Sequence, residues 1–293
     1  MELRVLQYFL AVAREQSISA AAESLHLTQP TLSTQLRAME EELGKQLLIR
    51  GTKGSRRVLL TEEGMILRKR AEEILALVQR TEEEIMHDDE AVVGDVYIGA
   101  GETDIVRLLA RAAREIQKQH PDIRYHISSG NAEHVLEQLD KGLIDFGLLF
   151  GRTDTQKYEA LSLPGKDTWG VLMRRDAPLA EKASVAPGDL LEKPLILTDQ
   201  PDDAQLLTRW LSPAGGAPHV VATYNLVYNA SLLVDEGLGY ALCLDRLINT
   251  DGSRLCFRPL SPPLESAASL VWKKYPAFSK AARTFLSCLR GLL

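Results

Sequence analysis

The sequence predicts a multidomain α+β protein with a helical N-terminal part and a C-terminal α/β part. Three observations support this. Residues 1–60 have the pattern of helix, turn, helix and β-hairpin, residues 61–88 form one long periodic helix, and strands alternate with helices from Gly94 onward. A length of 293 residues indicates two or three compact units.

The first 44 residues predict three helices. Apolar residues recur at helical spacing over residues 2–15, and an alanine-rich stretch over residues 20–25 predicts a short second helix. After a turn at residues 26–28, a third helix is expected over residues 29–43. Thr28 is its N-cap, Pro30 lies in its first turn, and Gly44 ends it.

Two short apolar strands follow, on either side of a basic, glycine-rich tip, and predict a hairpin over residues 47–60. The helix over residues 61–88 carries apolar or small residues at spacings of three and four, which is typical of a heptad seam that pairs with another helix. This seam consists of Leu67, Ala71, Ile74, Val78, Thr81 and Ile85. Its alanine and threonine predict weak pairing.

The second half contains two sets of β-α units, which predict parallel sheets covered by helices in two lobes. Segments near residues 165–168 and 262–265 join the lobes, so the chain is expected to cross between them twice. Ligands favour such interfaces and the N-termini of helices. The strand-to-helix turns therefore supply the candidate ligand-binding residues Gly101, Glu102, Thr103, Ser129, Asn131, Thr198, Asp199, Gln200, Tyr224 and Asn225.

These turn residues have an alternative interpretation, in which Ser, Thr, Asn and Asp only cap helices. Glu102 and Asp199 are unusual for a pocket that binds a simple carboxylate. They indicate a ligand with a cationic or hydroxyl-rich part.

The charge distribution points to the N-terminus as the nucleic-acid surface. Residues 1–60 carry a net charge of +2 and residues 61–93 a net charge of -6, within a total of -6. Phosphate would repel the rest of the chain. The third helix offers Gln29, Pro30, Thr31, Ser33, Thr34 and Arg37 to a major groove, and the hairpin offers Arg50, Lys53, Arg56 and Arg57 to the DNA backbone or a minor groove. The alternative is a plain helical bundle with a solvated polar face.

The motifs over residues 17–64 resemble the signature of LysR-type transcriptional regulators. The resemblance rests on Gln29-Pro30-x-x-Ser33, Glu40-x-x-Leu43-Gly44 and Leu60-Thr61-Glu62-x-Gly64, and continues in Glu236-Gly237-Leu238-Gly239-Tyr240-Ala241. Two positions depart from the family: Leu48 replaces the usual Phe, and Thr34 stands where many members place a base-reading Arg.

The resemblance implies a winged helix-turn-helix at residues 1–60, a linker or dimerisation helix at residues 61–90, and a two-lobed effector domain at residues 94–293, similar to a type 2 periplasmic binding protein. Lobe I would comprise residues 94–166 and 265–293, and lobe II residues 167–264. It also implies a double-stranded DNA operator with interrupted dyad symmetry, a homodimer that assembles into a homotetramer, contact with RNA polymerase, and a small-molecule effector whose identity the sequence leaves open.

Other chemistry is sparse. The six histidines lack metal-ligand spacing, no P-loop or G-x-S-x-G motif occurs, and Asp104 breaks a GxGxxG pattern. We therefore expect no enzyme activity, cofactor or metal. Three cysteines without CxxC spacing, no secretory signal, and no apolar run able to span a membrane indicate a cytoplasmic protein, with buried and unreactive cysteines as the favoured interpretation.

Two competing functions remain open at this point. One is a DNA-independent small-molecule binding protein or enzyme, in which the helical N-terminus only oligomerises. The other is an architectural DNA-binding protein with an empty cleft.

Overall fold

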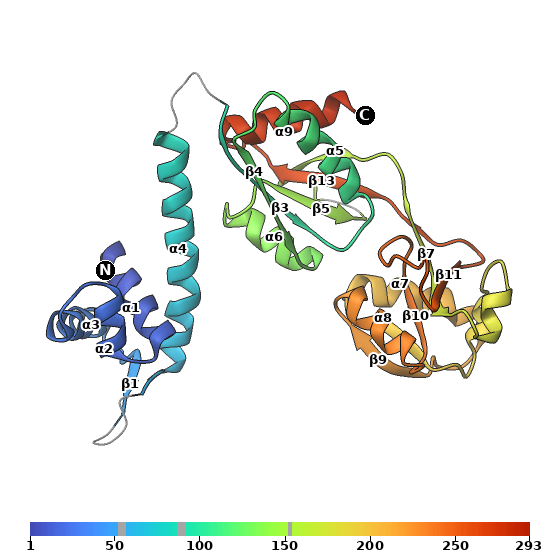
Figure 1. Cartoon of the computed structure of the whole chain (residues 1–293), viewed down its shortest axis with the longest axis horizontal. Helices are drawn as coiled ribbons and strands as arrows, with labels where there is room; N and C mark the ends of the chain where they lie inside the picture. Colours follow the sequence, from blue (N-terminus) through green and yellow to red (C-terminus); the bar gives the residue numbers. More distant parts are fainter. Residues whose placement is uncertain (52–56, 87–91, 152–153) are drawn as a thin grey trace. The chain divides into compact units, whose positions relative to one another are not determined.

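The computed structural model describes residues 1–51, 57–86, 92–151 and 154–293. The chain divides into two compact units, unit 1 over Met1–Asp88 and unit 2 over Asp89–Leu293 (Figure 1). The elements of unit 1 are α1 (Leu3–Glu15), α2 (Ile18–Ser24), α3 (Gln29–Leu43), β1 (Leu48–Arg50), β2 (Val58–Leu60) and α4 (Glu62–Met86).

Side-chain caps set the beginnings of the short helices in unit 1. The Ser17 hydroxyl accepts a hydrogen bond from Ala20 N at 3.3 Å, and the Thr28 hydroxyl accepts one from Thr31 N at 3.4 Å. Gly44 ends α3 with a left-handed φ of 65°. One apolar core joins all three helices to the hairpin, and its largest buried side chain is Phe9.

The first turn of α4 lies directly against the base of the hairpin. Thr61 donates a hydrogen bond from its hydroxyl to Gln46 O at 2.8 Å and from its backbone N–H to Leu47 O at 3.0 Å. A Cβ on Gly64 would lie 2.2 Å from Leu47 O, so only glycine allows this approach. The Thr61-Glu62-x-Gly64 motif is thus explained by packing.

The predicted seam on α4 is divided between two faces. Ala71 is fully buried in the core of unit 1 and is not available to a second chain, and the half-buried Leu67 packs against the same core. An exposed apolar face remains and consists of Ile66, Ile74, Leu77 and Ile85. The prediction of one continuous seam was therefore wrong in its first turns, because the helix also covers its own domain.

Unit 2 contains two mixed sheets. Sheet I has the strand order β4-β3-β5-β13-β6, in which β3 is parallel to β4 and β5, and β13 is antiparallel to β5 and β6. Its elements are β3 (Gly94–Ala100), α5 (Val106–Gln117), β4 (Ile123–Ser129), α6 (Ala132–Asp140), β5 (Phe146–Phe150), β6 (Tyr158–Ser162), β13 (Ala268–Lys273) and α9 (Lys280–Gly291). Helices α5 and α9 cover one face and α6 the other (Figure 1).

Sheet II has the order β11-β7-β10-β8-β9, with β12 paired to β7. Strands β8, β9 and β10 are parallel, and β7 is antiparallel to its neighbours. Its elements are β7 (Asp167–Arg174), β8 (Leu195–Thr198), α7 (Pro201–Leu211), β9 (Val220–Tyr224), α8 (Val227–Asp235), β10 (Tyr240–Leu244), β11 (Leu255–Pro259) and β12 (Glu265–Ser266), with short 3-10 turns η1 (Pro178–Glu181), η2 (Pro187–Leu190) and η3 (Ser212–Ala214). Helix α7 covers one face and α8 the other.

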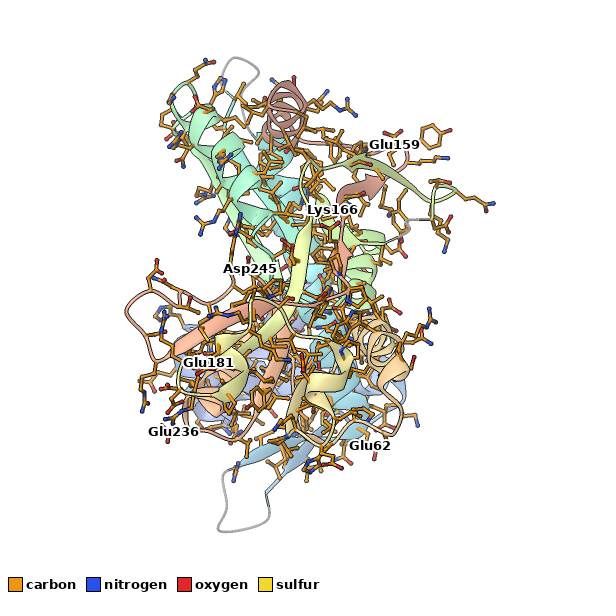
Figure 2. The ribbon with its side chains drawn as sticks, turned by 90° about the vertical axis from the view of Figure 1, so that its right-hand side faces the viewer. Glu62, Glu159, Lys166, Glu181, Glu236 and Asp245 are labelled. Carbon is orange, nitrogen blue, oxygen red and sulfur yellow. The ribbon has the colours of Figure 1, made fainter. Side chains whose placement is uncertain are left out.

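The chain crosses between the sheets twice, and the two crossings lie side by side. In β12, Glu265 pairs with Thr168 and Ser266 with Asp167 at the start of β7. Lys166, labelled in Figure 2, donates to Glu265 Oε2 at 2.7 Å across this pair of segments. Two short antiparallel segments therefore form the connection that holds the turns of both sheets near one another.

Candidate nucleic-acid interface and ligand pocket

Helix α3 has one buried face and one exposed polar face. Leu32, Leu36 and Met39 are buried in the core of unit 1. On the other side, the structure exposes Gln29, Pro30, Thr31, Thr34 and Arg37 and leaves Ser33 half-buried. The Thr31 hydroxyl lies 2.8 Å from the Thr28 hydroxyl. The polar residues predicted from the sequence therefore share one accessible surface at the beginning of this helix.

Arg50 lies at the base of the hairpin and is bound within unit 1. Its Nη2 donates to Glu40 Oε2 at 2.8 Å, while Glu40 Oε1 accepts from Leu47 N at 2.8 Å and from Leu48 N at 3.0 Å. Arg50 Nε is buried and has no hydrogen-bond partner among the described residues. The sequence predicts Arg50 at the DNA backbone, whereas the structure gives it a contact that ties β1 to α3.

The other end of the hairpin is anchored to α1. Arg57 Nε donates to Gln16 Oε1 at 3.0 Å, and Val58 N donates to Gln16 O at 2.8 Å. Arg57 is exposed beside this anchor. Lys53 and Arg56, the other predicted hairpin contacts, lie outside the described residues.

A cavity of about 260 Å³ in unit 2 is lined by turns from both sheets. An adjoining cavity of about 330 Å³ shares several of these residues and adds Ser129, His134 and Asp199. Between them the two cavities are lined by the predicted residues Gly101, Glu102, Ser129, Asn131, Thr198, Asp199, Gln200, Tyr224 and Asn225.

Thr103 is the predicted residue that lines neither of these cavities. It is buried, and its hydroxyl donates to Asp167 at the start of β7. Burial raises the pKa of Asp167, although the hydrogen bond from Thr103 opposes this effect. Thr103 thus holds the crossing between the sheets.

The neighbours of Thr103 also reach across to sheet II. Glu102 Oε2 accepts a hydrogen bond from Val227 N, in the first turn of α8, at 2.6 Å. Asp104 lies 3.7 Å from an Arg246 guanidinium nitrogen, in the turn after β10. Three consecutive side chains of one turn therefore contact sheet II or the segments packed on it, and Glu102 does so with a carboxylate at a helix N-terminus.

Sequence reasoning missed much of the cavity wall. Its apolar part includes Phe150, Trp169, Leu244 and Leu247, which lie in or next to strands and carry no local signal for a pocket. Asp202 and Asp203 were also missed, although only Pro201 separates them from the predicted turn at Gln200. Extending that turn into the first turn of α7 would have found them.

Tyr224 lines the cavity with its hydroxyl already engaged, because that hydroxyl donates to Leu242 O at 2.8 Å. Burial raises the pKa of Tyr224 strongly, and the nearby carboxyls of Asp203, Glu102 and Asp199 raise it further. The ring is therefore a neutral wall in a negatively charged environment.

Comparison with known proteins identifies both units. Residues 3–65 match the family described as "Bacterial regulatory helix-turn-helix protein, lysR family", and residues 90–293 match the "LysR substrate binding domain". The chain belongs to the LysR family. It is a LysR-type DNA-binding transcriptional regulator with an effector-binding domain, and this is a family of regulators and not of enzymes.

Individual LysR-type relatives agree with this assignment. The Hca operon transcriptional activator HcaR of Escherichia coli (strain K12) is 28% identical over 299 residues, covering 100% of this chain and 98% of the relative. The hydrogen peroxide-inducible genes activator of Dickeya chrysanthemi is 32% identical over 200 residues, covering 68% of this chain and 64% of the relative. The crystal structure of full-length CbnR complexed with its target DNA has a TM-score of 0.79 at 20% identity and covers 100% of both chains. The predicted fold class and the predicted regulatory function are confirmed.

Two further properties concern the described part of the chain. None of its helices has both the length and the apolar character needed to cross a membrane. Its His, Cys, Asp and Glu side chains form no group suited to a metal ion.

Proposed function

We propose that this LysR-type regulator reads its operator with the exposed face of α3 and grips the flanking DNA backbone with the hairpin. The observation that carries the proposal is the separation of the two faces of α3, with a buried apolar face and an exposed face of hydrogen-bonding side chains. Gln, Ser, Thr and Arg can each pair with base edges in a major groove. Gln29, Ser33, Thr34 and Arg37 are the proposed base readers.

The remaining proposed contacts position the helix. Pro30 and Thr31 lie in the first turn of α3, where the helix N-terminus favours a phosphate oxygen. Arg57, with Lys53 and Arg56, would contact the backbone from the hairpin. Because Arg50 is bound to Glu40, we propose that it acts by fixing the hairpin relative to α3, with any phosphate contact secondary.

We propose the division of labour that the sequence predicts, with residues 1–60 for DNA, 61–90 for dimerisation and 94–293 for the effector. The exposed apolar side chains on α4 support a homodimer formed through this helix. A dimer presents two reading helices to an interrupted dyad. Association of two dimers into a tetramer and contact with RNA polymerase complete the proposal, with the cytoplasm as the place of action.

We further propose that the effector binds in the cavity between the turns of sheets I and II, lobe I and lobe II of the sequence prediction. The contacts made by Glu102, Thr103 and Asp104 connect one lobe to the other beside this cavity. A ligand that binds more tightly to one arrangement of the lobes would increase the population of that arrangement. The change in the lobes would alter how the regulator binds DNA.

The reading surface is tested by substitution on an operator isolated for this protein. The double variant Ser33→Ala/Arg37→Ala should lose affinity for the operator and discriminate less against unrelated DNA, because base contacts are removed. Arg57→Ala should weaken binding to all sequences and reduce the salt dependence of the affinity. Arg68→Ala, an exposed arginine on α4, is the matched control. Full operator affinity in the double variant would refute the proposal.

A further inference from the structure

The cavity of about 260 Å³ in unit 2 carries an unbalanced negative charge. Four carboxylates line it, from Glu102, Glu133, Asp202 and Asp203. Among the described residues of its wall there is no Lys, Arg or His. The adjoining cavity adds Asp199 and one histidine. The Coulomb repulsion from these groups acts against any anion in the cavity.

Acidic side chains of the protein also occupy the helix N-termini, where an anionic ligand would bind most favourably. Three helices begin at the wall of this cavity, and the N-terminus of a helix attracts negative charge. Glu102 accepts the hydrogen bond from Val227 N at the beginning of α8, Glu133 lies in the first turn of α6, and Asp202 and Asp203 lie in the first turn of α7. A ligand carboxylate would have to displace or approach these groups.

Asp203 is the acid whose position most favours a cation. Its side chain is half-buried and has no hydrogen bond or ion pair with another described residue. Burial raises its pKa, and the neighbouring Asp202 raises it further. The Coulomb attraction of a cationic group beside this carboxylate would offset both effects.

Another part of the cavity lining is apolar and partly aromatic, with Phe150, Trp169 and Leu244 among its residues. Aromatic faces attract ammonium and guanidinium groups and also pack against hydrocarbon. The volume of about 260 Å³ suits a small molecule, just below the usual range of roughly 300–1,000 Å³ for ligand sites. The match of residues 90–293 to a substrate-binding domain independently indicates that this unit holds a ligand.

We propose that the effector is a small molecule with a protonated amine or guanidinium group next to an apolar body, and that Asp203 is the principal partner of its charge. This inference rests on the proposed location of the effector between the two lobes. Simple carboxylates are disfavoured as effectors.

The test uses three probes of similar size and different charge: phenethylamine, phenylpropionate and phenethyl alcohol. Binding to the full-length protein is measured by titration calorimetry and by thermal unfolding followed through tryptophan fluorescence. All three tryptophans, Trp169, Trp210 and Trp272, lie in unit 2 and report on the unit that holds the cavity. We expect phenethylamine to raise the unfolding midpoint and to bind about tenfold or more tightly than phenylpropionate, in line with a charge-assisted hydrogen bond.

Asp203→Asn keeps the shape of the side chain and removes its charge. It should weaken phenethylamine binding by about tenfold to a hundredfold, and it should leave the binding of phenethyl alcohol unchanged. Glu181→Gln, an exposed acid in the same part of unit 2 (labelled in Figure 2), is the matched control and should not alter either probe. Asn removes a half-buried charge that has no partner among the described residues, so we expect the variant to fold.

Three results would overturn the proposal: phenylpropionate binding as tightly as phenethylamine, an amine affinity unchanged in Asp203→Asn, or no binding of the amine at millimolar concentration. DNA selection with the unmodified protein and no probe tests the regulatory function separately. A failure of the ligand class can therefore be distinguished from a failure of the proposed function.

Discussion

Glu40→Ala is expected to loosen the hairpin, although Glu40 is not among the proposed DNA contacts. The Glu40 side chain is 12% exposed and accepts three hydrogen bonds, from Leu47 N, Leu48 N and Arg50 Nη2. Hydrogen bonds to a charged group contribute about 1.5–3 kcal/mol each, but they do not add fully because water enters the space left by the side chain. We expect the free energy of unfolding of unit 1 to fall by about 2–4 kcal/mol.

The effect should be confined to unit 1. Hydrogen–deuterium exchange of the amides over residues 47–50 should accelerate, and the far-UV circular dichroism transition attributable to unit 1 should move to lower denaturant. The tryptophan fluorescence transition should not change, since Trp169, Trp210 and Trp272 all lie in unit 2. Operator affinity should fall because the hairpin no longer has a fixed position relative to α3.

Glu41→Ala provides the matched control, because Glu41 is an exposed neighbour on the same helix. Glu40→Gln should be intermediate, since its carbonyl oxygen can still accept from the backbone while its amide faces the Arg50 guanidinium as a second donor. Unchanged exchange at residues 47–50 in Glu40→Ala would refute the reasoning, as would an equal effect of Glu41→Ala.

Three further outcomes are expected. Gly64→Ala should destabilise unit 1 by about 1–3 kcal/mol or more in chemical unfolding, because the added Cβ would lie 2.2 Å from Leu47 O; wild-type stability would contradict this packing. Burial raises the pKa of the Cys243 thiol to about 12, so Cys243 should resist alkylation by iodoacetamide in the native protein and react only after unfolding; rapid alkylation of Cys243 in the folded protein, located by mass spectrometry, would contradict this burial. Burial raises the pKa of Asp203 in the folded protein above its pKa in the unfolded chain. The free energy of unfolding should therefore fall as the pH rises from the unfolded-state pKa toward the folded-state pKa. Asp203→Asn should have the higher unfolding midpoint at neutral pH, and this difference from the unmodified protein should vanish in acid.

Whether two cysteines can form a disulfide depends on their strand positions, which composition does not give. The sequence favours buried, unreactive thiols but gives no pairing geometry. In sheet II, Cys243 lies opposite Gly170 and Cys256 opposite Met173, and the two side chains pack in cores on opposite faces of the sheet. These two thiols cannot meet without rearrangement of the sheet.

Local signals predicted the helices of unit 1 well. Thr28, Pro30 and Gly44 act through their own backbone neighbourhood, so the limits of α3 follow from a few consecutive residues. The contact between Arg50 and Glu40 was not predicted, because Glu40 is ten residues away on a different element. An arginine in a hairpin looks the same in the sequence whether its side chain contacts a DNA phosphate or a carboxylate of the protein.

The long helix shows the same limit. Periodicity predicts that α4 has an apolar face, but not which partner covers each turn. The core of unit 1 takes Leu67 and Ala71, while Ile66 and Leu77, outside the predicted seam, are left exposed.

In the cavity, the turns at the ends of parallel strands were predictable because a parallel sheet brings them to one edge. Its apolar wall was not, since residues such as Trp169 look like ordinary core residues in sequence. No local signal predicts strands β6 and β11. Both lie at sheet edges and pair with strands far along the chain, β6 with β13 and β11 with β7.

Selection of genomic fragments bound by the purified full-length protein, followed by sequencing, tests the central claim most directly. At moderate ionic strength the account predicts enrichment of fragments that share an interrupted dyad, and loss of this enrichment in Ser33→Ala/Arg37→Ala with retention in Arg68→Ala. Recovery of fragments without any shared sequence by the unmodified protein would contradict it.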